Sequence, residues 1–112
     1  MAKYLFMGSY TDEGVKRLLA DGAQARVEAT TLLAAAMGAK VEVFYFAFGS
    51  DDFVMIADGP DNVSAAAGSL YANATGITHP RIVVLMTPEE MEAAVKLAKG
   101  GQLPPLWGTE IK

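Results

Sequence analysis

The chain has 112 residues, of which 52% are hydrophobic, and a formal net charge of -4 at pH 7. This length and composition predict a single domain with one core. The acidic balance excludes the basic surface of a nucleic-acid-binding protein, and the absence of cysteine excludes disulfides and thiolate sites. No apolar run approaches the roughly 20 residues of a membrane span, and the N-terminus is untypical of a signal peptide. We therefore expect a cytoplasmic protein without membrane or nucleic-acid partners.

The first predicted element is a strand at 3–10, rich in aromatic residues and followed by turn-forming ones. Thr11 is predicted to cap a helix, because its hydroxyl can accept a hydrogen bond from a free backbone N–H. Gly22 interrupts the helical periodicity, so we expect a break there with Asp21 as a second cap. Gly38 ends this helical region.

Two further strands are predicted at 40–48 and 52–58, on either side of a tight turn "GSD". Asp61 then caps a second helical region, which Gly76 ends. Apolar residues at three- and four-residue spacing predict its buried stripe. The stripe consists of Val63, Ala66, Ala67, Leu70 and Ala74.

A fourth strand is predicted at 81–87, and it leads into "TPEEM". Thr87 as cap, Pro88 at the first helical position and Glu90 three residues after the cap predict a capping box and a third helix. Residues 1–99 form the predicted domain, and residues 100–112 a tail whose prolines exclude a continued helix.

The order strand, helix, strand, strand, helix, strand is the βαββαβ pattern of the ferredoxin-like fold. It predicts an α+β domain with a four-stranded antiparallel sheet, helices on one face of the sheet, and an additional C-terminal helix followed by the tail. No internal repeat or low-complexity linker interrupts this order.

Both faces of the predicted sheet are apolar, because alternate residues of a strand point to opposite faces. In the second strand one face holds Val41, Val43, Tyr45 and Ala47, and the other holds Glu42, Phe44, Phe46 and Phe48. Two helices cover only one face of an antiparallel sheet. A second copy packed sheet against sheet would cover the other face and form a dimeric α+β barrel. The alternative is that the third helix, or the tail "LPPLWG" with Trp107, folds back over it.

Three segments carry a resemblance to a known family: "YLFMGSYTDEGVKRLL", "VEVFYFAFGSDDFVMIADGPDNVSAAA" and "VVLMTPEE". Together, over roughly residues 3 to 95, they resemble the GYD domain family of small bacterial and archaeal proteins in the dimeric α+β barrel superfamily. The resemblance implies the ferredoxin-like fold and a homo-oligomer, either a dimer or a multiple of dimers. It implies no particular activity.

The Gly-Tyr-Asp signature of that family falls at the turn between the second and third strands. Gly49 and Asp52 match it, but Asp51 stands where the resemblance implies a tyrosine. Turn chemistry alone explains the two matching residues, because glycine supplies a positive φ and aspartate bonds to turn amides. The alternative is a catalytic pair of carboxylates.

His79 is the only histidine, so a two-histidine metal site is excluded, and we predict no metal and no cofactor. It precedes Pro80 in "ITHPR", which favours an extended loop entering the fourth strand. His79 or Asp52 would be the proton acceptor if the protein were an enzyme. A solvated or capping histidine is the alternative.

Tyr10 and Tyr45, with the phenylalanines of the second strand, offer the aromatic surface and the hydroxyl groups that a flat organic ligand would use. Packing in the core or at an interface explains the same residues without a ligand. Two hypotheses follow, and whether the protein is an enzyme stays open. One is a homo-oligomeric domain that binds or transforms a small apolar or aromatic molecule in a pocket between sheet and helices. The other is an assembly protein whose sheet face serves oligomerisation only.

Overall fold

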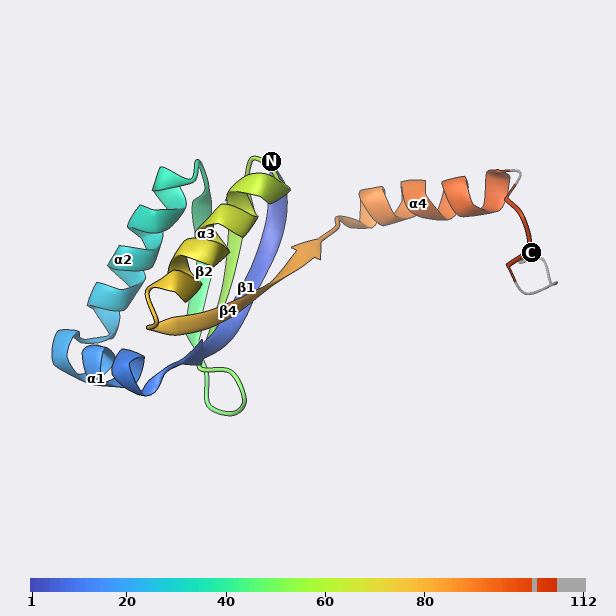
Figure 1. The fold of residues 1–112 in the computed structure, drawn as a ribbon. Coiled ribbons are helices and arrows are strands. Elements are labelled where there is room, and N and C mark those ends of the chain that lie inside the picture. Colours follow the sequence, from blue (N-terminus) through green and yellow to red (C-terminus); the bar gives the residue numbers. More distant parts are fainter. Residues whose placement is uncertain (102, 107–112) are drawn as a thin grey trace.

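The computed structural model describes residues 1–101 and 103–106. It contains four strands, β1 (Ala2–Tyr10), β2 (Lys40–Phe46), β3 (Phe53–Gly59) and β4 (Thr78–Leu85), and four helices, α1 (Asp12–Asp21), α2 (Ala23–Ala36), α3 (Asn62–Ala74) and α4 (Pro88–Gly100) (Figure 1). Their order confirms the predicted α+β class, the ferredoxin-like pattern and the additional C-terminal helix.

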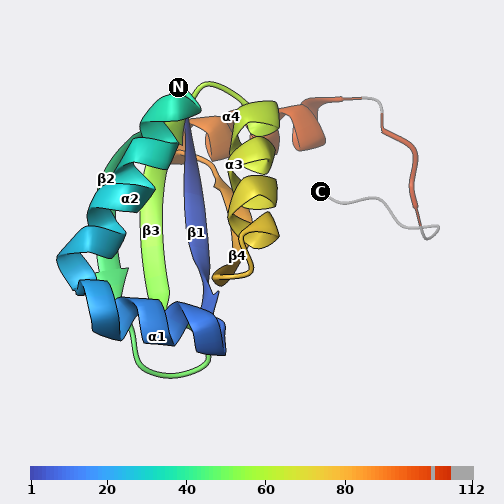
Figure 2. The ribbon, with the colours of Figure 1, turned by 60° about the vertical axis from the view of Figure 1, so that its left-hand side comes forward.

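The four strands form one antiparallel sheet in the order β2-β3-β1-β4, with β1 and β3 in the centre. Helices α2 and α3 lie over the same face of the sheet, and α1 crosses one end of that face (Figure 2). The opposite face, which we call the open face, carries no helix in the described part of the chain. The prediction that helices cover only one face of the sheet is therefore confirmed.

Local capping explains where three of the helices begin. The Thr11 hydroxyl accepts from the Gly14 N–H at the start of α1, and the Asp61 carboxylate accepts from the Ser64 N–H at the start of α3. That backbone hydrogen bond lowers the pKa of Asp61. At α4, Thr87 and Glu90 form the predicted capping box with hydrogen bonds of 3.1 and 2.9 Å.

The break at Gly22 is confirmed, but the predicted cap at Asp21 is wrong. Gly22 separates α1 from α2 with φ of 88°, a conformation that glycine adopts without strain, and it occupies the N-cap position of α2 itself. No side chain caps this helix. The Asp21 carboxylate instead lies 3.6 Å from the Arg26 guanidinium, because the turn at Gly22 brings the two side chains together.

Several strand boundaries differ from those predicted, by one to three residues. Strand β2 ends at Phe46 rather than at 48. Strand β4 begins at Thr78 rather than at 81, so His79 and Pro80 belong to it. A proline fits here because β4 is an edge strand and needs no outward hydrogen bond from that residue.

A bulge in β2 makes the predicted division of its faces wrong. Val41 pairs with Ala57, whereas Val43 pairs with Ile56, so the extra residue Glu42 shifts the alternation by one position. Val41 therefore lies on the helix side with Ala57. Val43 and Tyr45 lie on the open face.

The predicted buried stripe of α3 is also wrong. Val63 and Leu70 are 78% and 72% exposed, and they point away from the sheet. The stripe that faces the sheet consists of small residues, namely Ser64, Ala65, Gly68, Ser69 and Ala72. The helix thus turns its larger apolar side chains outward.

Helix α4 projects from the end of β4 away from the rest of the domain (Figure 1). The apolar residues of this helix do not pack against the sheet, and Met91 and Val95 are 51% and 41% exposed. The predicted alternative in which this helix covers the second sheet face is therefore wrong. Trp107 lies outside the described residues. No helix in the described ranges combines the length and the apolar content that crossing a bilayer requires.

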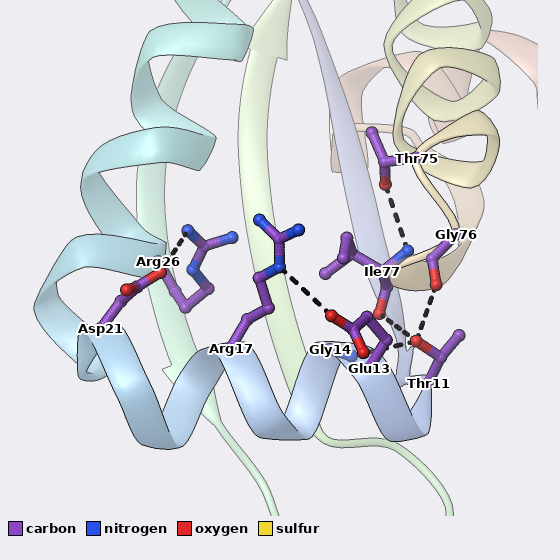
Figure 3. Close-up of polar contacts among 9 residues, drawn as sticks. All are labelled: Thr11, Glu13, Gly14, Arg17, Asp21, Arg26, Thr75, Gly76 and Ile77. Carbon is purple, nitrogen blue, oxygen red and sulfur yellow. Dashed lines mark hydrogen bonds and ion pairs between the residues drawn. The ribbon is translucent and has the colours of Figure 1, made fainter.

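The corner between β1 and α1 packs closely against the α3–β4 loop and the start of β4. A β-carbon on Gly8 would lie 2.2 Å from the His79 carbonyl oxygen, and one on Gly14 would lie 2.2 Å from the Ile77 carbonyl oxygen. The Thr11 N–H also donates to the Ile77 carbonyl of this loop at 2.9 Å. The Thr11 hydroxyl donates to the Gly76 carbonyl at 2.7 Å (Figure 3). These contacts explain Gly8, Thr11 and Gly14 of the "GSYTDEG" segment.

Replacing Gly14 by alanine should destabilise the domain. In an open helix this change would stabilise by about 1 kcal/mol, but here the new methyl group meets a backbone oxygen that cannot move freely. We expect a net loss of about 1–3 kcal/mol in the free energy of unfolding, measured by urea denaturation. Gly100→Ala is the matched control, because nothing lies within 4 Å of that site. Equal effects of the two changes would contradict this account of the corner.

Candidate functional site

A cavity of about 130 Å³ lies between the helices and the sheet. Its walls are mainly apolar and strongly aromatic. The sheet side consists of Tyr4, Phe6, Tyr10, Phe44, Phe53, Met55, Ala57, Gly59, Thr78 and Pro80, and the helix side includes Arg26, Thr30, Leu33, Ala34 and Met37 of α2 and Ser64, Ala65, Gly68, Ser69 and Ala72 of α3. The cavity joins this apolar wall to a few polar groups.

The small residues of α3 account for the empty space. Protein interiors are usually packed without voids, and a helix normally turns its largest apolar side chains to the core. Gly68 has only Met37 near it, with 3.7 Å between a built β-carbon and Met37 Cγ. Leu70 would fill part of the volume if α3 were rotated, but it is exposed. The sequence of α3 therefore leaves the cavity open.

Arg26 is the charged side chain in the cavity wall. Its side chain is only 24% exposed, and its Nε is buried without a hydrogen-bond partner among the described residues. An unpaired buried donor costs about 1–3 kcal/mol. Asp21 neutralises part of the charge at 3.6 Å, a distance too long for a hydrogen bond. The side chains of Arg26 and Arg17 both rise from their helices towards the space between α2 and α3 (Figure 3).

Sequence reasoning did not select Arg26. The available signal was its spacing, because Arg26, Thr30, Leu33 and Met37 follow each other at three- and four-residue intervals and form one stripe of α2. All four line the cavity. An arginine within such a stripe indicates a charge turned towards the core.

Tyr10 lies at the end of β1 with its ring in the cavity wall. The ring centroids of Tyr10 and Phe53 are 5.4 Å apart, and those of Phe53 and Phe44 are 6.2 Å apart in a stacked arrangement. Burial raises the pKa of the Tyr10 phenol, and the positive charge of Arg26 opposes this effect only in part. The phenol is therefore protonated at neutral pH and can donate a hydrogen bond.

Asp52 holds the hairpin turn against β1. Its carboxylate accepts from the Tyr10 N–H at 2.9 Å, and its own N–H donates to the Gly8 carbonyl at 2.7 Å. Its neighbour Asp51 pairs with Arg81 at 2.8 Å. The two carboxylates thus bind different partners, and Asp52 is close to Tyr10 without being part of the cavity wall.

Tyr45 and His79 lie apart from the cavity. Tyr45 is 68% exposed on the open face, beside Val54. His79 is exposed on β4, and its Nδ1 lies 3.4 Å from the Asn73 Oδ1. The structure therefore brings together Tyr10 and Asp52 but neither Tyr45 nor His79 with them. Within residues 1–101 and 103–106, no group of three acidic or histidine side chains could hold a metal ion.

Comparison with known proteins gives one clear match. The sequence model of the GYD domain family matches residues 4–95, which run from within β1 to within α4. No curated protein matches the chain significantly. The matched range contains the whole cavity.

Removing the Asp52 carboxylate should cost more stability than removing that of Asp51. Asp52→Ala deletes an acceptor that ties the hairpin turn to Tyr10, and a hydrogen bond to a charged group contributes about 1.5–3 kcal/mol. Asp51→Ala deletes a pair whose Arg81 side chain is 64% exposed, and such pairs contribute about 0–1 kcal/mol. Urea denaturation of both variants measures the difference. A larger loss at Asp51 would refute the structural role given to Asp52.

Proposed function

This chain belongs to the GYD domain family, and we propose that it is a homo-oligomeric domain that binds a small apolar or aromatic molecule in its cavity. The observation that carries the proposal is the cavity itself, whose wall is mostly apolar and aromatic with a few polar groups. Ligand sites combine these two features, because apolar surface supplies affinity and polar groups fix orientation. Tyr10 supplies both, through its ring, which packs against Phe53, and through its protonated phenol.

The size of the cavity suits one ring. A cavity of about 150 Å³ lined by apolar side chains is sufficient to bind benzene, and the volume here is about 130 Å³. Aromatic groups in the wall favour a flat guest, because rings attract each other in offset or edge-to-face geometry. Phe6, Phe44 and Phe53 provide these groups.

Binding is better supported than catalysis. A reaction in the cavity would need a proton acceptor within hydrogen-bond reach of the ligand. Asp52 and His79 are the proposed acceptors, but neither belongs to the cavity wall. Asp52 already accepts from the Tyr10 N–H, which occupies one of its carboxylate oxygens. We therefore propose binding as the primary function, and a reaction of the bound molecule as the secondary proposal.

Filling the cavity should abolish binding of a ring-sized apolar probe. In Ala72→Leu the longer side chain occupies the space that the ligand would use, because Ala72 lies in the wall. Toluene should shift the amide resonances of cavity residues in the unaltered protein, measured by two-dimensional NMR, and should not shift them in this variant. Ala66→Leu on the exposed side of α3 is the control and should bind toluene normally. Absence of any toluene-dependent shift in the unaltered protein would refute the proposed cavity ligand.

The open face supports a second candidate function, which is assembly. Its central row consists of Val43, Ile56, Leu5 and Val83, one residue from each strand. The adjacent row consists of Tyr45, Val54, Met7 and Arg81. An apolar surface of this extent on a soluble protein marks an interaction site. A second copy packed sheet against sheet would bury it and form the dimeric α+β barrel.

Charged groups border this apolar surface at both ends. The Lys3 ammonium binds Glu42 and Asp58 at one end, and these hydrogen bonds raise the pKa of Lys3. Arg81 binds Asp51 at the other end. An apolar centre with a polar rim is the usual anatomy of a protein interface. The arrangement therefore supports oligomerisation through the open face.

Placing a charge in the central row should separate the subunits. Ile56 pairs with Leu5 and Val43, so Ile56→Lys puts an ammonium group in the middle of the proposed interface. We expect the unaltered chain to be a dimer or a multiple of dimers by native mass spectrometry, and this variant to be a monomer. Val63→Lys is the control, because Val63 is 78% exposed on the opposite side of the molecule. A monomeric unaltered chain would exclude the homo-oligomer, and a dimeric Ile56→Lys variant would exclude this face as its interface.

A further inference from the structure

The charge of the cavity wall is positive. Arg26 is its charged member, and among the described residues no aspartate or glutamate joins it in the wall. Asp21, the carboxylate nearest to the guanidinium, has a side chain 47% exposed and lies 3.6 Å away. Water screens a pair of this kind. A ligand in the cavity would therefore meet an incompletely compensated positive charge.

Within the described part of the chain, the Arg26 guanidinium also has N–H groups that are free to donate hydrogen bonds to a ligand. Arginine carries five N–H donors in a planar fork that matches a carboxylate. Among the described residues the side chain of Arg26 donates no hydrogen bond, and its Nε is buried without a partner. Tyr10, in the same wall, adds a protonated phenol as a further donor. The cavity thus presents donors to its ligand, which favours a ligand that supplies acceptor oxygens.

We propose that the ligand of this cavity is a small aromatic carboxylic acid with a single ring, bound as its carboxylate. The ring would lie against Phe6, Phe53 and Tyr10, and the carboxylate would accept from the Arg26 guanidinium. This inference rests on the proposed binding function and adds the class of ligand. The volume of about 130 Å³ limits the apolar part to one ring.

Benzoate and benzamide are matched probes for this inference. They have nearly the same shape, but only benzoate carries a negative charge. We expect benzoate to bind the unaltered protein about tenfold or more tightly than benzamide, because a hydrogen bond to a charged group is stronger than a neutral one. The dissociation constants are measured by NMR titration at constant ionic strength, with the shifts located at cavity residues. This comparison requires no variant.

Substitutions then assign the preference to Arg26. Arg26→Met keeps an unbranched apolar stem without the charged guanidinium, and it should remove the preference for benzoate while leaving benzamide binding within about twofold. Arg26→Lys keeps the charge and should retain part of the preference. Lys96→Met is the control for net charge, because Lys96 is exposed on α4, which projects away from the domain, and does not line the cavity. It should retain the full preference.

The outcomes separate this inference from the proposed function. Equal binding of benzoate and benzamide at the cavity would overturn the acid as ligand and leave the apolar cavity site intact. An equal loss of preference in Arg26→Met and Lys96→Met would overturn Arg26 as the contact, because it would show a general effect of net charge. If neither probe shifts cavity residues, the acid is excluded, and the result with toluene decides whether the cavity binds any ring at all.

Discussion

The arrangement of the helices depends on the packing of one corner of the chain, where β1 turns into α1. Gly8 and Gly14 have no room for a β-carbon, and Thr11 donates two hydrogen bonds to the α3–β4 loop. This corner fixes α1 across the end of the sheet (Figure 2). The positive φ of Gly22 then redirects the chain, so that α2 runs over the sheet and Arg26 enters the cavity wall. The position of the one charged wall residue thus follows from two close backbone contacts and one turn.

The cavity exists because small residues of α3, rather than its large apolar residues, face the sheet. Burying Val63 and Leu70 would stabilise the domain by about 1.5–3 kcal/mol for each side chain. The helix instead turns Gly68 and Ala72 to the sheet and leaves the larger residues in solvent. A natural sequence that departs from efficient packing usually does so where function requires it. This departure is therefore an argument for the cavity as a site, independent of the identity of its wall residues.

The predictable part of the structure was the part that local chemistry decides. The capping box at Thr87 and the break at Gly22 depend on neighbours within a few residues, and both were found. The bulge before Val43 depends on how β2 pairs with β3, so the sequence of one strand does not reveal it. The outward face of Leu70 was missed because apolar spacing assumes that the largest residues are buried. Arg26 was missed because a charged side chain is assumed to be solvated.

The cavity and the open face share the same two central strands. Phe6 and Met55 point into the cavity, and their neighbours Leu5 and Ile56 belong to the open face, because successive residues alternate across the sheet. A ligand that orders β1 and β3 from one side would therefore order the surface that a second copy contacts on the other. By thermodynamic linkage, a ligand that strengthens assembly must itself bind the assembled form more tightly, by the same factor. Ligand binding and oligomerisation are thus compatible functions of one sheet. A bulky substitution in the cavity is therefore expected to affect both ligand binding and assembly.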